Sequence, residues 1–580
     1  MAPWSMRRLS EMRRGIPWGM RWLSGMRLGI LQDRKLERVP GTSTVLDDEG
    51  RQRGDNVPID PSLKYDLSGP RPIILVPQPS DDPNDPLNWP LWRRDVILFV
   101  LSLISVIATT LSPILAANTV SVAIVFGRNF TEIALATGYH LLGVALAGIV
   151  CVPSARVWGK RHLYLLGTVF VVFSCAWCGA SGTNYASLLW SRIFQGFGLA
   201  PFEALVNASV GDLYFVHERG KRMALSNLAL FGGAFFTPVL VGKITREMGW
   251  YWTFYFVAIF AGVMLPLVFF FVPETAFRRD ARFNTDFFDS KEAVATRNGN
   301  AEQKENGVEL PSYDDATRSS AKPPPPPKAT FWQMLAPFNG RKTDEKFWKL
   351  LLRPFPLFFH PAILWACLIQ GALIGWTVFI GIVLAIIMLG PPLFFNEVET
   401  GYMYTGAFIG ALLGFVLSGV LSDWSTNLLI RRNKGVYEPE FRMILVIPQL
   451  VFGCAGLYGF GITAANTSRY GWFWPDFFFA LEVMGMVLGA VASALYIVDA
   501  HREIAVEAFT CLLVFKNIFS FGLTWSGYNW ITEAGTKTVF YWISSVQVVV
   551  CMLTVLMYVF GKRNRSFFAR HDILKMLHLW

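Results

Sequence analysis

Charged side chains are scarce in this chain. Asp, Glu, Lys and Arg make up 16% of its 580 residues, whereas hydrophobic residues make up 53%. Ordinary soluble domains carry about 25% charged residues. The shortage excludes a disordered protein and a soluble enzyme of ordinary composition. The apolar excess predicts instead a protein that crosses the lipid bilayer several times.

Cysteine and the common site motifs are also rare. All seven cysteines lie in or beside apolar runs, which indicates small buried hydrophobes rather than a disulfide-stapled secreted domain. The P-loop pattern G-x-x-x-x-G-K-[ST] does not occur, and its absence disfavours an ATP-driven pump. Neither a metal-site spacing nor a nucleophile arrangement stands out. We therefore expect no metal, no cofactor and no enzyme activity.

The chain has a net charge of +10. In a soluble chain such an excess would suggest a nucleic-acid partner. In an apolar chain it is better explained by cytoplasmic loops that face anionic lipid. No nucleic-acid partner is expected.

Long apolar runs dominate the remainder, and a helix needs about 20 such residues to span the hydrocarbon core. Twelve runs qualify: 95–118, 132–154, 162–182, 186–210, 224–245, 251–272, 361–386, 401–423, 443–464, 473–497, 506–530 and 539–560. They predict an all-α membrane protein with two six-helix bundles, over 95–272 and 361–560. A largely disordered tail (1–94), a central loop (273–360) and a terminal tail (561–580) complete the chain.

Basic residues are distributed unevenly over the loops between these runs. One side of the membrane receives Arg156, Lys160, Arg161, Arg219, Lys221, Arg222, Arg431, Arg432, Lys434, Arg442 and Arg502, and the other receives Arg128, Lys243, Arg246, Arg469 and Lys537. Because short cytoplasmic loops carry the excess of Lys and Arg, both termini and the central loop are predicted to be cytoplasmic. The sequons at Asn129 and Asn466 then face outward as candidate glycosylation sites, although their closeness to the membrane disfavours modification.

Two segments outside the runs are unusual. Residues 3–16 recur as 17–30 with ten of fourteen positions identical, which indicates a coding duplication or, alternatively, a basic surface-binding or targeting segment. The central loop carries five consecutive prolines from Pro323 to Pro327. Such a run favours extended polyproline geometry and serves as a spacer more often than as a ligand for an SH3-like partner.

Two motifs inside the runs are more specific. The fourth run contains Arg192-x-x-Gln195-Gly196-x-Gly198, and the fifth contains Gly233 and Pro238 in the order G-A-F-F-T-P-V-L-V-G. The first resembles the R-x-x-Q-G-x-G motif of drug:proton transporters in the major facilitator superfamily. The second resembles the antiporter motif G-x-x-x-G-P-x-x-G-G, with Thr237 and Val241 in place of two glycines. The six-plus-six layout is similar to that of the same superfamily, whose halves rock about a central site.

Loop motifs support the same resemblance. Pro273-Glu274-Thr275 resembles the superfamily's half-ending motif, and Val216–Gly220 and Val436–Arg442 resemble loops of its fungal twelve-span drug:proton antiporters. Gly159-Lys160-Arg161 resembles the end of the loop motif G-x-L-x-D-R-x-G-R-R, and Gly419 to Asp423 resembles its second copy. An Asp that caps a helix end beside basic residues would form a gating latch, so Gly159 and Asp423 are assigned to gating. Positive charge that only sets topology is the alternative for the first copy.

The fourth run also carries the candidate coupling residues. Arg192, Gln195 and Glu203 recur at helical spacing, and Arg192 and Glu203 lie eleven residues apart, about 16 Å along a helix. A charged group inside the membrane is costly and is usually functional. We expect Glu203 to carry the proton and Arg192 to assist its release; the alternative for Glu203 is a packed side chain bonded to neighbouring hydroxyls.

Other polar groups inside the runs are candidates for the substrate cavity. They are His140, Gln370, Glu482, Lys516 and Asn517. A lone histidine in a helix is more often a packing residue than a proton relay. Glu482 and Lys516 could pair with each other, or Lys516 could meet a substrate carboxylate.

These patterns together predict a secondary transporter driven by the proton gradient. The resemblance implies efflux of a small amphipathic organic compound, either a xenobiotic or a metabolite of the cell. The alternative is proton-coupled uptake of a small cationic nutrient such as a polyamine, which acidic Glu203 and Glu482 would suit. The expected partners are the substrate, protons and the lipid bilayer, and the expected state is a monomer in the plasma membrane or, alternatively, the vacuolar membrane.

Overall fold

The computed structural model describes residues 26–33, 35–36, 39–44, 64–66, 73–75, 77–278 and 327–580. Most of the duplicated segment 3–30 and most of the proline run therefore lie outside the described residues. The described residues form two compact units. Those within 56–351 and 395–404 form what we call the N-terminal unit, and those within 1–55, 352–394 and 405–580 form the C-terminal unit.

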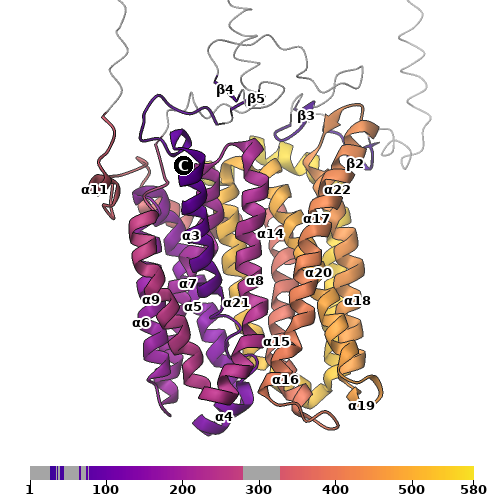
Figure 1. The fold of residues 1–580 in the computed structure, drawn as a ribbon. Helices are drawn as coiled ribbons and strands as arrows, with labels where there is room; N and C mark the ends of the chain where they lie inside the picture. The colour runs from indigo at the N-terminus through magenta and orange to yellow at the C-terminus, as the bar shows by residue number, and fades with distance from the viewer. Residues whose placement is uncertain are drawn as a thin grey trace, which may run out of the picture. The chain divides into compact units, whose positions relative to one another are not determined.

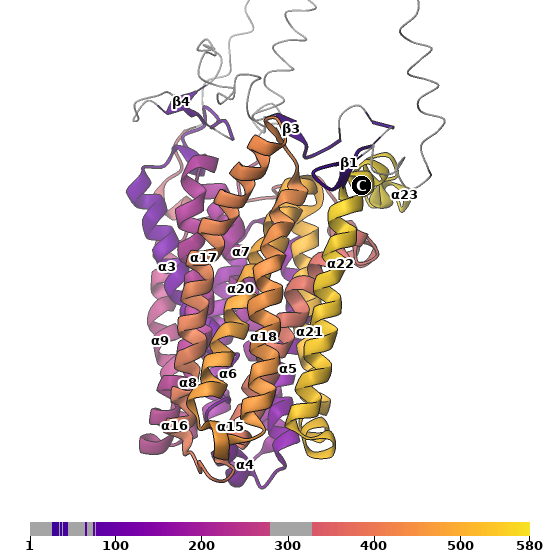
Figure 2. The same ribbon diagram turned by 90° about the vertical axis from the view of Figure 1, so that its right-hand side faces the viewer.

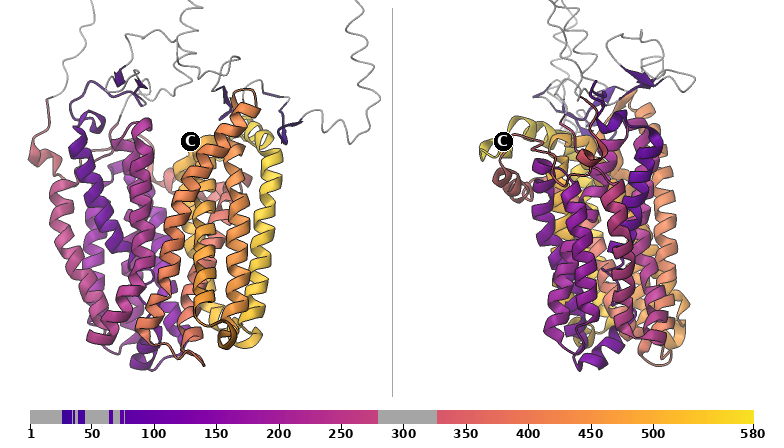
Figure 3. Two further views of the ribbon diagram at one scale, coloured as in Figure 1. Left: turned by 45° about the vertical axis from the view of Figure 1, so that its right-hand side comes forward. Right: turned by 60° about the vertical axis from the view of Figure 1, so that its left-hand side comes forward.

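The N-terminal unit is built from long helices that run side by side (Figures 1 and 3). Its helices are η1 (Pro86–Asn88), α3 (Leu91–Thr109), α4 (Thr119–Phe126), α5 (Phe130–Trp158), α6 (Arg161–Gly179), α7 (Tyr185–Leu213), α8 (Val216–Met248), α9 (Trp250–Phe271), α11 (Phe331–Met334), α12 (Phe347–Leu352) and α16 (Glu397–Tyr402). Its strands β4 (Tyr65–Asp66) and β5 (Ile73–Ile74) pair antiparallel. One apolar core, which includes Leu101, Phe202 and Phe254, joins α3, α7 and α9.

The C-terminal unit is a second set of long helices, seen from the side in Figure 2. Its helices are α13 (Pro354–Leu357), α14 (Pro361–Ala366), η3 (Cys367–Ala372), α15 (Leu373–Leu389), α17 (Tyr404–Arg432), η4 (Pro439–Leu445), α18 (Val446–Ala464), α19 (Thr467–Tyr470), α20 (Phe473–Ala500), η5 (Arg502–Ile504), α21 (Ala505–Ala534), α22 (Thr536–Arg570) and α23 (Ile573–Met576). Its strands are β1 (Met26–Arg27), β2 (Ile30–Leu31), β3 (Ser43–Thr44) and β6 (Val436–Tyr437). Glycines bring α18 and α20 together, because Gly485 lies against the backbone of Gly453.

The all-helical prediction is confirmed, and the strands are confined to two-residue pairs among the described residues. Within that part of the chain, ten helical stretches are long and apolar enough to cross a membrane. The predicted runs 95–118 and 186–210 also form helices, α3 and α7, but these are not among the ten. Charged Arg93, Arg94 and Asp95 begin α3, and polar residues including Arg192 and Glu203 interrupt α7, so both are less apolar than an ordinary span.

Several predicted boundaries are wrong. The first run predicts a helix to residue 118, but α3 ends at Thr109 and turns precede α4. The last predicted run ends at residue 560, but α22 continues to Arg570, and its residues Gly561, Arg565 and Ser566 are buried in the C-terminal unit. Within the predicted tail 1–94, the described residues 26–33 and 77–90 make specific contacts.

Candidate functional site

Arg192 is the centre of a buried polar cluster in the N-terminal unit. Its side chain is fully buried on α7. Nη1 donates to the carbonyl of Leu111 at 2.8 Å and to Oε1 of Gln195 at 2.7 Å, and Nε donates to the carbonyl of Ala136 at 3.3 Å. The guanidinium therefore joins three parts of the unit: the segment that follows α3, helix α5 and helix α7. Its Nη2 nitrogen is left without a bond among the described residues.

His140 of α5 belongs to the same cluster. Its ring is fully buried, with Nδ1 at 3.4 Å from the carbonyl of Arg192 and Nε2 at 3.3 Å from the hydroxyl of Ser112. The structure thus places three sequence candidates, Arg192, Gln195 and His140, in one interior site.

The glycines of the same motif have a packing role. A side chain at Gly196 would overlap the backbone of α5 at His140, and one at Gly198 would lie 2.9 Å from the backbone nitrogen of Val171 on α6. Small residues allow such close helix approach in membrane proteins. The motif therefore combines polar residues that bond inside the unit with glycines that bring α7 against α5 and α6.

The antiporter-like motif of α8 makes three close backbone contacts with neighbouring helices. A side chain at Gly233 would lie 2.7 Å from the carbonyl oxygen of Val106 on α3. At the other end of the motif, Gly242 lies against the backbone of Glu397 in α16, and the carbonyl of Pro238 lies against Gly401 in α16. Any larger residue at Gly233 must push α3 away. Although Thr237 and Val241 replace two glycines of the family pattern, these close approaches remain.

Gly159 separates α5 from α6 and has a positive φ of 93°. A Cβ here would overlap the carboxylate of Glu274, which accepts hydrogen bonds from the backbone nitrogens of Lys160 at 2.9 Å and Arg161 at 3.1 Å. A carboxylate at a helix N-terminus is favourable because it satisfies free N–H groups and the helix dipole. The half-ending motif thus binds the loop motif.

The basic residues of this loop make specific bonds to other parts of the N-terminal unit. Lys160 donates to Asp212 at 2.6 Å, and Arg161 is buried and donates to the carbonyl of Phe269 at 2.7 Å, near the end of α9. The sequence does not single out Asp212, because an acidic residue at the end of an apolar run belongs to no pattern. Glu274 is recognisable in its motif, but its partners follow only from the fold.

Asp423 does not lie at a helix end as predicted. It is an exposed residue within α17, which continues beyond it to Arg432. The run is predicted to end at Asp423 because polar residues begin there, but the helix extends beyond its apolar part. A capping role for Asp423 is therefore wrong, whereas its assignment to gating stays a prediction.

Glu203 lies three turns from Arg192 on α7 and is half-buried. The side-chain hydrogen bonds of Arg192 go instead to Leu111, Ala136 and Gln195. Near Glu203 on the same helix, Asn207 accepts from Ser226 at 2.7 Å and donates to Asn227 at 2.8 Å, both on α8. Glu203 therefore lies one helical turn from a residue, Asn207, that bonds to polar side chains of α8.

The C-terminal unit contains its own polar interior. Glu482 on α20 is fully buried, and its Oε1 accepts from Thr377 on α15 at 2.8 Å. Its Oε2 has no hydrogen-bond partner among the described residues. The suggested pair with Lys516 is therefore not formed, since one carboxylate oxygen is bonded to Thr377 and the other is unpartnered. Thr377 is not foreseen, because a threonine in an apolar run gives no signal.

Gln370 lies in η3, a six-residue π-helical turn between α14 and α15. Its Oε1 accepts from Ser493 at 3.2 Å, and the neighbouring carbonyl of Ile369 accepts from Gln449 at 2.9 Å. Such wide turns often occur at functional sites. Asn517 is buried and donates to Leu513 of its own helix at 2.9 Å, and Lys516 is half-buried. The cavity roles of all these residues stay predictions.

The two sequon asparagines each begin a helix. Asn129 forms a capping box with Glu132 at the start of α5, and Asn466 caps α19. Both are exposed. Groups of three or more His, Cys, Asp or Glu side chains that could hold a metal are not found among the described residues.

Comparisons with known proteins agree with this architecture. The profile of the Major Facilitator Superfamily matches residues 97–506. Protein HOL1 of Saccharomyces cerevisiae is 24% identical over 577 residues, covering 92% of this chain and 96% of its own. Efflux pump radE of Floropilus chiversii is 24% identical over 548 residues, covering 92% and 90%. A solved D-xylose-proton symporter shares the fold with a TM-score of 0.55 and 14% identity, covering 81% of this chain and 99% of its own.

Proposed function

Because this chain belongs to the Major Facilitator Superfamily, it is a multi-pass membrane transporter and not an enzyme, and we propose that it exports a small amphipathic organic compound in exchange for protons. The substrate would be a xenobiotic or a compound made by the cell. The proposed site is the plasma membrane, with the vacuolar membrane as the alternative, and the proposed state is a monomer.

One structural feature carries the proposal of antiport. The antiporter-like motif on α8 makes backbone contact with α3 through Gly233 and with α16 through Gly242. Close packing without bulky side chains is what this motif would need to seal the helices against leakage of protons or substrate. The relative named an efflux pump supports the direction of transport.

A second function is favoured by a different observation. Glu482 is a fully buried carboxylate with one oxygen unpartnered among the described residues. A buried charge is costly unless it is paired. A cationic substrate would supply the missing partner, so uptake of a small cation such as a polyamine is the alternative.

The direction of transport separates the two functions even while the substrate is unidentified. We expect cells that lack the protein to accumulate one or a few small amphipathic compounds relative to cells that contain it, while the medium is depleted of the same compounds. Mass spectrometry of cell extracts and medium measures both pools. If cells that lack the protein are instead depleted of a cation such as spermidine, uptake is correct and export is wrong.

The membrane orientation is proposed from the loop charges. Twelve spans with both termini and the central loop in the cytoplasm place the basic excess inside. A reporter inserted after Gly340, or fused to the C-terminus, is expected to be cytoplasmic, and one inserted after Arg469 is expected to be outside. A reporter at Gly340 that is found outside would contradict the six-plus-six arrangement.

A further inference from the structure

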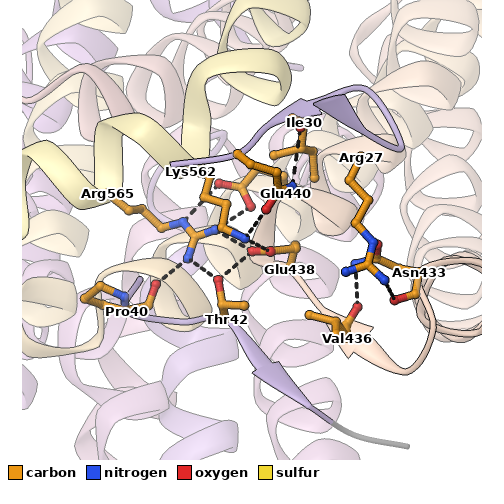
Figure 4. Close-up of polar contacts among 11 residues, drawn as sticks. Arg27, Ile30, Pro40, Thr42, Asn433, Val436, Glu438, Glu440, Lys562 and Arg565 are labelled. Atoms are coloured by element: carbon orange, nitrogen blue, oxygen red, sulfur yellow. Dashed lines mark hydrogen bonds and ion pairs between the residues drawn. The ribbon is translucent and has the colours of Figure 1, made fainter. Parts of the chain in front are cut away.

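The described residues between 26 and 44 belong to the C-terminal unit although they lie far from the rest of it in sequence. β1 and β2 form a hairpin in which Met26 pairs with Leu31 and Arg27 with Ile30. β3 then pairs antiparallel with β6, the strand that follows α17, with Thr44 opposite Val436. Figure 4 shows this segment beside α22 and the turn before α18. We call residues 26–33, 35–36 and 39–44 the tail segment.

Apolar contacts anchor the hairpin. Ile30 and Leu31 are each 1% exposed. Ile30 belongs to a small buried cluster with Ile430 of α17 and Phe441 of η4. Gly29 lies against the ring of Tyr558 on α22, whose hydroxyl donates to the carbonyl of Leu28 at 3.0 Å. Side chains buried to this degree behave as part of a core, not as a solvated strand.

A charged cluster anchors the rest of the tail segment (Figure 4). Arg565 of α22 is buried and donates to Glu440 at 2.7 Å and to Glu438 at 2.8 Å. Its Nη1 also donates to the carbonyl of Pro40 and, at 3.3 Å, to the hydroxyl of Thr42. Thr42 in turn donates to Glu438 at 2.6 Å. The tail segment thus completes the shell of acceptors around a buried guanidinium.

Further bonds extend these contacts along the tail segment. Lys562 donates to both Gln32 and Glu438, and Ser566 donates to Asp33 at 2.6 Å. Near the hairpin, Arg27 donates to the carbonyl of Asn433 at 3.1 Å. The last turns of α22 and the segment after α17 are therefore joined through the tail segment as well as directly.

The cluster favours the charged form of the Glu438 carboxylate. Burial opposes its charge, but the hydrogen bonds from Lys562 and Thr42 and the charge of Arg565 outweigh burial and lower its pKa from the ordinary value. A lowered pKa in the folded state means that the contribution of the Glu438 carboxylate to stability is present at neutral pH and is lost as the pH falls through that lowered pKa.

We propose that the tail segment is a fixed brace of the C-terminal unit, docked on the surface formed by α22 and residues 430–441, and that it stays docked during transport. Its release would expose Ile30 and Leu31 and would leave Arg565 without two of its acceptors. The opposite arrangement is a strap that must release before transport, and it would require a small free energy of undocking. Undocking here would expose a buried apolar anchor and break a completed charged cluster, so its free energy is large.

Disulfide formation tests docking in the intact protein. All seven native cysteines are buried, so background reaction is low. In Thr44→Cys/Val436→Cys the two cysteines are opposite in register, whereas in Ser43→Cys/Val436→Cys they are one position out of register, because Ser43 pairs with Tyr437. A shift of one residue moves a side chain to the other face of a strand pair. We expect rapid disulfide formation in membranes for the first pair and little for the second, measured by mass spectrometry of the linked peptides. Equal reaction of both pairs, or of neither, would overturn the proposal.

Thermal unfolding tests whether the segment braces the unit. Ile30→Asp places a charge in the buried cluster, whereas Leu28→Asp changes a residue of the same hairpin that is 37% exposed. We expect the melting temperature of the purified full-length protein to fall by several degrees for Ile30→Asp and to stay unchanged for Leu28→Asp. Equal melting temperatures for the two variants would show that the tail segment is not integral.

A transport assay tests whether the tail segment stays docked during transport, and this test rests on the proposed function. The probe is the compound whose amount, measured by mass spectrometry, differs most between cells with and without the protein. We expect oxidised Thr44→Cys/Val436→Cys to transport it at the rate of the reduced protein. A loss on oxidation that a reductant reverses would identify a releasing strap and overturn the brace. If the wild-type protein moves no such compound, the proposed function fails, while the first two experiments still decide the brace.

Discussion

Arg192→Lys is expected to lower transport by roughly 100-fold while the protein still reaches the membrane. Arg192 donates through two nitrogens to three acceptors: the carbonyls of Leu111 and Ala136 and the side chain of Gln195. A lysine ammonium is a single point on a flexible stem and cannot reproduce this planar arrangement. Leaving buried acceptors unsatisfied costs about 1–3 kcal/mol each, and about 1.4 kcal/mol corresponds to a tenfold change in rate.

The measurement is uptake into inverted membrane vesicles under an imposed pH gradient, normalised to the amount of protein. Arg246→Lys, the same substitution at an exposed residue near the end of α8, is the control and should behave as wild type. Transport by Arg192→Lys at the control rate would show that only the positive charge matters and that the bonded geometry does not.

Glu203→Gln is expected to abolish transport driven by the pH gradient while exchange of substrate across the membrane continues. Glutamine is nearly isosteric and polar, so the contacts around α7 should survive. It cannot bind or release a proton, so a gradient could no longer drive the cycle. Carboxylates inside membrane helices serve as such proton carriers in many transporters.

Two assays on the same proteoliposomes separate coupling from binding. The first follows net transport under an imposed pH gradient, and the second follows exchange of labelled for unlabelled substrate without a gradient. Glu247→Gln, at an exposed residue of α8, controls for the substitution itself. Gradient-driven transport by Glu203→Gln at the wild-type rate would exclude Glu203 as the coupling residue and direct attention to Glu482 or His140.

The structure changes the relation between Arg192 and Glu203 that the sequence suggests. Their spacing on one helical face predicts that they act together. In the fold, Arg192 is occupied by backbone carbonyls and Gln195, while Glu203 lies in a half-buried part of α7 near Asn207. Arg192 is not bonded to Glu203, and its effect on proton release is expected to act through its electric field or through its bond to Gln195. The two substitutions are thus expected to fail in different ways: Arg192→Lys in both assays, Glu203→Gln in the gradient assay only.

The structure also gives the loop motif around Val436 a physical role that the sequence does not reveal. The sequence identifies Val436–Arg442 only as a likeness to a fungal family. In the structure, Glu438 and Glu440 hold Arg565, and Arg442 donates to Asp499 at 3.2 Å and to Ser422 at 2.7 Å. The motif is therefore a connector between α17, α20 and α22, which explains why several charged residues occur in so short a segment.

The sequence by itself determined the helical membrane architecture and the two-bundle order, because a helix that spans lipid needs a long apolar run and such runs are visible without any contact information. It also located Arg192, Gln195, Gly233 and Pro238, since polar residues and glycines are conspicuous inside apolar helices. Only the tertiary structure decided which groups meet. Thr377 beside Glu482, Asp212 beside Lys160 and Pro40 beside Arg565 come from segments far apart in the chain, and periodicity along one helix contains no information about its neighbours. Helix ends such as that of α17 were likewise invisible in the apolar pattern, because the helix continues past the exposed Asp423 to Arg432 while Ser425, Thr426 and Ile430 stay buried on its packed side.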